Sequence, residues 1–74
     1  MGSESKQERF RRLGMMRGNR VLRDIELLGN LSNTNNYEYS TEQVRIIFSA
    51  IEDEIRIAKQ RFNGGAKSKR EIVL

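Results

Sequence analysis

The sequence has no cysteine, histidine, proline or tryptophan among its 74 residues. Without cysteine and histidine it cannot form a disulfide, build a structural zinc site, or offer a thiol nucleophile or an imidazole base. Most enzyme classes need at least one of these groups, so we predict a non-enzymatic protein with no metal or other cofactor. The absence of proline is also compatible with long, uninterrupted helices.

Long apolar runs are absent as well. No stretch approaches the roughly 20 apolar residues of a membrane-spanning helix, and the charged N-terminus lacks the apolar segment of a signal peptide. No glycine-rich phosphate loop is present, because Gly64-Gly65 follows a predicted helix and lacks the required spacing. We therefore expect a cytoplasmic protein with no membrane partner and no small-molecule substrate.

The composition is that of a small globular domain, with 36% hydrophobic residues. A single domain of this length buries only roughly 60% of its unfolded surface, which makes it marginally stable alone. A second subunit or another partner can complete such a core. Self-association is therefore expected from length alone.

The clearest helical pattern covers about residues 41–62. Ser40 and Gln43 have the spacing of a capping box at its start, and Asn63-Gly64-Gly65 can adopt the left-handed backbone that ends a helix. Apolar residues recur on one face at steps of three and four. On this helix we predict as core Val44, Ile47, Phe48, Ile51, Ile55, Ala58 and Phe62.

An earlier helix is predicted at about residues 19–29. Its core residues are Val21, Ile25 and Leu28, and Gly29-Asn30 offers a C-terminal cap. Gly14 and Gly18 each cost up to about 1 kcal/mol inside a helix. We therefore predict that the basic N-terminal segment 1–18 is only partly helical, with a helix over about residues 5–18 that frays, bends or is completed by contact.

Asparagine and serine residues fill the segment between the two predicted helices, which indicates a structured turn. A turn of this length allows an antiparallel helical hairpin over residues 19–63, followed by a flexible basic tail at 64–74. Tyr37 and Tyr39 are predicted to cover the helix ends as a lid, with ligand contact as the alternative. The apolar end of the tail, Ile72-Val73-Leu74, is given no role.

Both predicted helices carry apolar residues outside their main stripe. A two-helix hairpin would leave these residues in water, so they are candidates for a homodimer interface in a four-helix bundle. The alternative is a set of scattered surface residues, which is common. The candidate interface residues are Met16, Leu27, Ile46, Ala50 and Ile57.

Positive charge is concentrated near the N-terminus. Seven basic residues and one acidic residue lie between Lys6 and Arg23, a local excess of six charges within a net charge of +4. Such an arginine-rich segment is typical of phosphate contacts, although a solvated basic face explains the same residues. The candidate phosphate-contacting residues are Arg9, Arg11, Arg12, Arg17, Arg20 and Arg23.

The acidic run Glu52-Asp53-Glu54 does not form a catalytic carboxylate pair, because consecutive helical residues face different directions. Glu52 and Arg56 have the spacing of an ordinary surface ion pair.

A resemblance to other proteins rests on the loop and the start of the following predicted helix. The residues that match are GNLSNTNNYEY at 29–39, EQV at 42–44, IF at 47–48 and AIE at 50–52. This part of the chain resembles short uncharacterised bacterial and phage- or plasmid-borne proteins with this loop and following helix. The resemblance implies a bacterial or phage setting and a loop that belongs to the fold. It implies no particular activity.

Two functions are therefore expected from different classes. The first is a homo-oligomeric helical module that binds or modulates a macromolecular partner, which includes a protein partner. The second is a nucleic-acid-binding protein that contacts the phosphate backbone without reading sequence, because side chains for base recognition are not placed near the basic segment.

Overall fold

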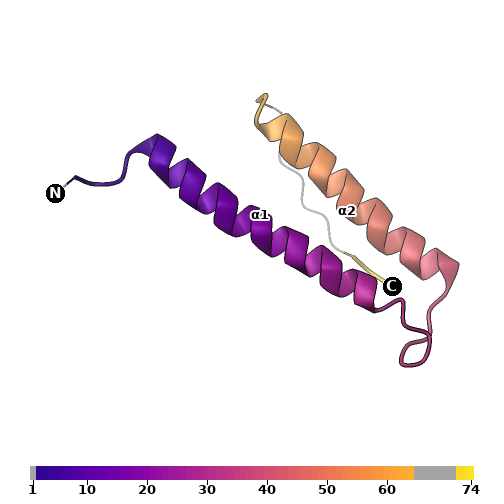
Figure 1. The fold of residues 1–74 in the computed structure, drawn as a ribbon. Coiled ribbons are helices and arrows are strands. Elements are labelled where there is room, and N and C mark those ends of the chain that lie inside the picture. Colours follow the sequence, from indigo (N-terminus) through magenta and orange to yellow (C-terminus); the bar gives the residue numbers. More distant parts are fainter. Residues whose placement is uncertain (1, 65–71) are drawn as a thin grey trace. The chain divides into compact units, whose positions relative to one another are not determined.

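The computed structural model describes residues 2–64 and 72–74, and it contains two helices. Helix α1 runs over Lys6–Asn30 and helix α2 over Thr41–Arg61 (Figure 1). The described residues contain no strand. The chain divides into two compact units, Met1–Tyr37 and Glu38–Leu74, each with one helix. The predicted all-α class with two helices is thus confirmed.

Helix α1 begins at Lys6, so the N-terminal segment is partly helical as predicted, and its helical part joins residues 19–30 without a break. Ser5 is its N-cap, and Ser5 with Glu8 forms a complete capping box. The box satisfies two backbone donors that would otherwise lack partners in the first turn. Gly14 and Gly18 lie inside this continuous helix, so the cost of two glycines does not interrupt it.

The end of α1 also differs from the prediction. Gly29 remains within the helix, and the C-cap is Leu31 with a right-handed backbone at φ −69° and ψ −6°. The amide of Leu31 donates to the carbonyl of Leu28 at 3.0 Å, and the amide of Ser32 donates to the carbonyl of Gly29 at 3.1 Å. The helix therefore tightens into a final three-residue turn instead of using a left-handed cap.

Asn33 organises the segment after α1. Its side-chain oxygen accepts from the amide of Asn35 at 3.0 Å, and its carbonyl accepts from the amides of Asn36 and Tyr37 at 3.1 and 3.0 Å. This is an Asx turn followed by a backbone turn, the local pattern that asparagine favours. The prediction of a structured turn is confirmed.

Helix α2 begins as its sequence predicts. The amide of Gln43 donates to Ser40 Oγ at 3.0 Å, and the amide of Ser40 donates to Gln43 Oε1 at 2.9 Å. After the C-cap Phe62, Gly64 adopts a left-handed backbone with φ 84°. The predicted stop is confirmed at Gly64, whereas Gly65 and most of the predicted tail lie outside the described residues.

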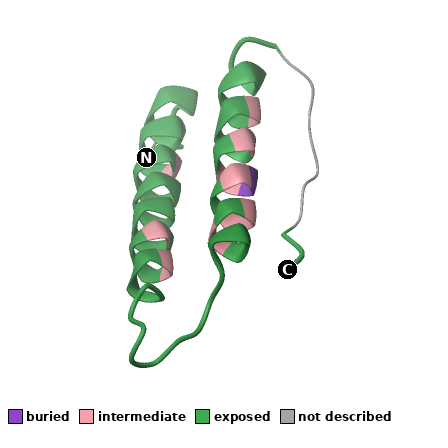
Figure 2. Cartoon of the chain, turned by 90° about the vertical axis from the view of Figure 1, so that its right-hand side faces the viewer, coloured by how far each residue is buried: buried purple, intermediate pink, exposed green. Residues whose placement is uncertain are grey.

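Only one residue of the described chain is buried. Ala50 in α2 keeps 6% of its surface exposed, and it is coloured purple in Figure 2. Half-buried positions follow one side of α2: Val44, Ile46, Ile47, Ser49, Ile51, Asp53 and Ile57. Helix α1 has no buried residue, and its half-buried positions are Leu13, Ile25 and Leu28. The described chain thus has almost no dry core of its own.

Candidate functional site

Four arginines form a line along α1. They are spaced by three, eight and three residues, which brings them to one side of a helix that turns about 100° per residue. The arginine line consists of Arg9, Arg12, Arg20 and Arg23. At about 1.5 Å of rise per residue, it extends over roughly 21 Å. An array of this length suits a polyanion better than a single small anion.

Not all the predicted phosphate contacts share this line. Lys6 and Arg17 flank it on one side, whereas Arg11 lies about 140° around the helix from its centre. All seven basic side chains of α1 are exposed. Sequence counting grouped Arg11 with its neighbours, but the continuous helix separates it from Arg9 and Arg12.

Met16 and Leu27 lie on the arginine line, Met16 between Arg12 and Arg20 and Leu27 one turn beyond Arg23. Both are about half exposed. These two residues were predicted to form part of a dimer interface. The helix therefore places two predicted functions on the same surface.

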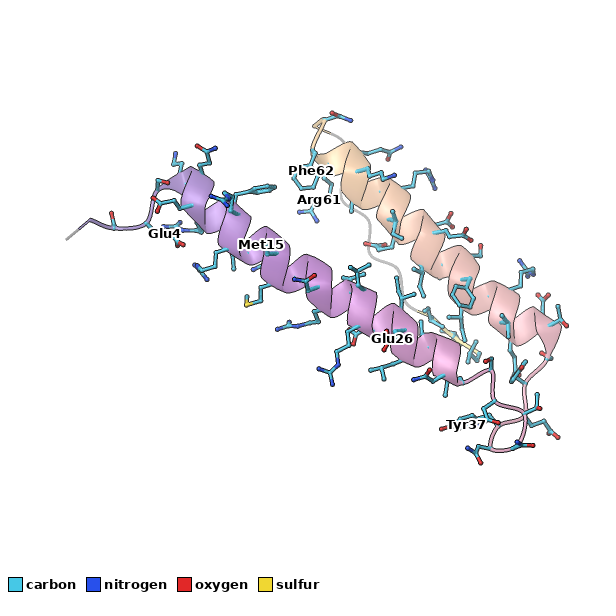
Figure 3. The ribbon with its side chains drawn as sticks, in the orientation of Figure 1. Glu4, Met15, Glu26, Tyr37, Arg61 and Phe62 are labelled. Atoms are coloured by element: carbon cyan, nitrogen blue, oxygen red, sulfur yellow. The ribbon has the colours of Figure 1, made fainter. Side chains whose placement is uncertain are left out.

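Glu4 binds the arginine line at its N-terminal end. Its carboxylate accepts from Arg12 Nε at 2.8 Å and from Arg12 Nη2 at 3.0 Å, and Arg9 Nε lies 3.9 Å from it. The Glu4 side chain keeps 31% of its surface exposed, against 55% for Arg12. Figure 3 labels Glu4 where the N-terminal segment enters α1. Sequence analysis missed this residue because it lies eight positions from Arg12, outside ordinary helical pair spacing.

The pKa values follow these contacts. The hydrogen bond from Arg12 lowers the pKa of Glu4, and the same contact raises the pKa of Arg12. The pKa of Glu8 is also lowered, mainly by its hydrogen bonds with Ser5. Glu4 is therefore ionised at neutral pH and offsets part of the positive charge at one end of the line.

The two helices differ in charge. Helix α1 contains seven basic and three acidic residues, a net of +4, whereas α2 contains four of each and is neutral. On α2 the Arg45 guanidinium binds Glu42, which lowers the pKa of Glu42. Arg56 Nη2 lies 3.6 Å from Asp53 Oδ1, so the predicted pair of Arg56 with Glu52 is wrong. The three-residue spacing brings Asp53 within reach of Arg56 as readily as the four-residue spacing brings Glu52.

The predicted core and interface residues of α2 differ in exposure. All three predicted interface positions are sheltered: Ala50 is buried, and Ile46 and Ile57 are half-buried. In contrast, four predicted core positions of this helix are exposed. They are Phe48 at 39%, Ile55 at 41%, Phe62 at 78% and Ala58. We call Phe48, Ile55 and Phe62 the apolar edge of α2; its members recur every seven residues.

Among the predicted core residues of α1, Ile25 and Leu28 are half-buried and Val21 is exposed. Tyr37 and Tyr39 are both exposed, at 48% and 42%. They belong to different units of the chain, because Tyr37 ends the first and Tyr39 lies in the second. Their role as a lid stays a prediction.

Other kinds of site have little support within residues 2–64 and 72–74. No group of acidic side chains there is arranged to hold a metal ion, and neither helix is long and apolar enough to cross a membrane. A shallow pocket at the end of α2 is lined by Ala58, Arg61 and Phe62, the last two labelled in Figure 3. These lining residues provide one cation and no acid or nucleophile.

Comparison with protein-family models, with curated proteins and with solved structures gave no match to this chain.

Proposed function

We propose that this protein is a non-enzymatic helical interaction module that pairs with a second copy of itself. The observation that carries the proposal is the apolar edge of α2. Phe48 and Ile55 in α2 and Phe62 at its C-cap are exposed along one line, and seven-residue spacing is the repeat by which helices pack side by side. Large apolar side chains in such a line mark an interaction surface.

The width of the apolar face of α2 supports more than one neighbour. From Ile46 around to Phe48 its apolar residues cover an arc of about 200° at 100° per residue. One packed helix covers an apolar stripe closer to 100° wide. Helix α1 of the same chain, in an antiparallel hairpin, would cover one part of this arc. A second hairpin would cover the rest, giving a symmetric four-helix bundle.

The charge of α1 favours a contact between copies through α2. If Met16 and Leu27 were packed against the same residues of a second copy, the arginine lines of both chains would be brought together. Like charges brought together at an interface cost several kcal/mol. Pairing through neutral α2 avoids this repulsion and leaves the arginine line facing outward.

The molecular mass in solution tests the proposal. Light scattering at micromolar concentration is expected to give twice the chain mass. Two double variants, Ile46→Glu with Ile57→Glu and Phe48→Glu with Phe62→Glu, separate the two parts of the apolar arc. The one that faces the second copy is expected to halve the mass while circular dichroism still shows helix.

A control variant changes the charge of α2 without touching its apolar face. Arg45→Gln with Arg56→Gln alters the net charge by the same two units on the polar side and should leave the mass unchanged. A monomeric mass for the unaltered protein would contradict the proposal.

The arginine line favours a second candidate function, the binding of nucleic acid through its phosphates. Arginine engages phosphate oxygens through two parallel hydrogen bonds, and four arginines on one side of α1 can follow a charged backbone. Binding of a generic duplex is expected to weaken steeply as salt rises. Replacing Arg9, Arg11 and Arg12 together by glutamine should flatten this dependence, and no binding at low salt would exclude the function.

A further inference from the structure

We propose that Arg9 and Arg12 form a phosphate-binding site that the carboxylate of Glu4 occupies in the free protein. Glu4 is then an internal competitor that a polynucleotide must displace. The inference rests on the nucleic-acid candidate function, which it deepens by assigning one site and its regulation.

The geometry of the Glu4 carboxylate supports the assignment. Its two oxygens accept from Nε and Nη2 of Arg12 at 2.8 and 3.0 Å, the parallel arrangement in which a guanidinium also binds two oxygens of a phosphate. Arg9 approaches the same carboxylate at 3.9 Å. Two cations therefore converge on one oxyanion, at the position where a phosphate would bind.

The rest of the arginine line indicates the class of ligand. Arg20 and Arg23 continue the line for roughly two further turns of α1 beyond Met16. A single phosphate would engage only the Arg9–Arg12 end, whereas a nucleic-acid backbone carries charges along its whole length. An anionic membrane is less suited, because surface-bound helices pair their basic face with a strongly apolar one, whereas Gly14 and Gly18 interrupt the side of α1 opposite the arginine line.

The strength of the Glu4 contact sets the size of the effect. Exposed ion pairs are weak, so Glu4 is expected to reduce phosphate affinity by no more than about fivefold. A competitor of this strength would adjust affinity without preventing binding. Glu4 would also lower the slope of log affinity against log salt concentration, because Arg12 is already neutralised before the ligand binds.

The experiment compares Glu4→Gln with Glu26→Gln, using fluorescence anisotropy of a labelled generic DNA duplex over a series of salt concentrations. Both variants raise the net charge by one, and both residues belong to the first unit of the chain. Glu4→Gln is expected to strengthen binding about two- to fivefold more than Glu26→Gln. It should also steepen the logarithmic salt dependence by up to about one unit, as expected for one more phosphate contact.

A double-mutant cycle makes the test specific to the site. In a chain that already carries Arg9→Gln and Arg12→Gln, the change Glu4→Gln should have no more effect than Glu26→Gln. Circular dichroism of each variant checks that α1 is retained.

The possible outcomes separate the inference from the function on which it rests. Equal effects of Glu4→Gln and Glu26→Gln would overturn the internal competitor while leaving duplex binding intact. If no variant binds duplex at low salt, the nucleic-acid function itself fails. Binding to phosphatidylserine vesicles but not to duplex would overturn the choice of ligand.

Discussion

Ser5 and Glu8 exchange two hydrogen bonds across the first turn of α1. The amide of Glu8 donates to Ser5 Oγ at 3.1 Å, and the amide of Ser5 donates to Glu8 Oε1 at 3.1 Å. The pair fixes the first turn of the helix, so the basic residues that follow it occupy defined positions. The arginine line depends on this start, because its residue spacing brings the four arginines to one side only if the helix is continuous.

Replacing Ser5 by alanine should therefore unwind the first turns of α1. Loss of an N-cap serine costs about 1 kcal/mol, and the effect should be largest for the residues nearest the cap. Amide hydrogen exchange is expected to speed up between about residues 8 and 14 and to change little in α2. Ser3→Ala, a serine outside the cap, is the control, and equal exchange in both variants would contradict the role of the box.

The same capping rule was used at one helix and overlooked at the other. Ser40 and Gln43 were recognised because a strong apolar pattern follows them, whereas Ser5 and Glu8 precede residues dominated by arginine and glycine. The apolar pattern therefore located α2 almost to the residue but left the start of α1 without a defined cap. Local hydrogen bonds, and not apolar periodicity, mark where α1 begins.

Gly14 and Gly18 provide a second prediction. Both lie inside α1, and a Cβ atom added at either position has nothing within 4 Å. Alanine restricts the unfolded chain more than glycine does, so each Gly→Ala change should stabilise α1 by up to about 1 kcal/mol. Thermal unfolding followed by circular dichroism measures the change.

Gly64→Ala is the matched control for these two variants. Its added Cβ also meets nothing within 4 Å, but the backbone has φ 84°, which side-chain-bearing residues rarely adopt. Gly64→Ala should therefore destabilise the end of α2 although no clash occurs. If Gly14→Ala or Gly18→Ala lowers stability instead, the added Cβ atom is not in open space. Another segment or a partner must then approach the glycine closely.

The pH dependence of α1 should reflect Glu4. Its pKa lies below the ordinary value for glutamate because Arg12 binds the ionised form. The stabilisation from this contact is therefore complete above the ordinary value, about 4.3, and is lost as the pH falls through the lower pKa of the folded protein. Carbon NMR of the carboxyl groups measures the value directly.

In Arg12→Gln the pKa of Glu4 should rise toward the ordinary value, since its principal hydrogen bond is gone. The pKa of Glu42, which Arg45 lowers on the other helix, should stay where it is. A Glu4 pKa that does not respond to Arg12→Gln would show that the contact is not formed in solution.

The candidate site was only partly predictable from the sequence. Counting charges located the basic segment, because a charge count does not depend on where the helix begins. It could not separate Arg11 from Arg12, since that distinction requires the angular positions that a continuous helix imposes. Nor could it find Glu4, because Glu4 precedes the extended N-cap Ser5, where the pair spacings of a helix no longer apply.

The separation of Arg11 from the arginine line leads to the last prediction. Arg11→Gln and Arg20→Gln remove the same charge from the same helix, and both side chains are exposed. If phosphates are bound along the line, Arg20→Gln should reduce duplex affinity more and lower the logarithmic salt dependence by about one unit. Arg11→Gln should act only through net charge, with a smaller loss and an almost unchanged slope. Equal slopes for the two variants would mean that α1 attracts nucleic acid as a diffuse positive charge and that the arginine line is not a defined binding surface.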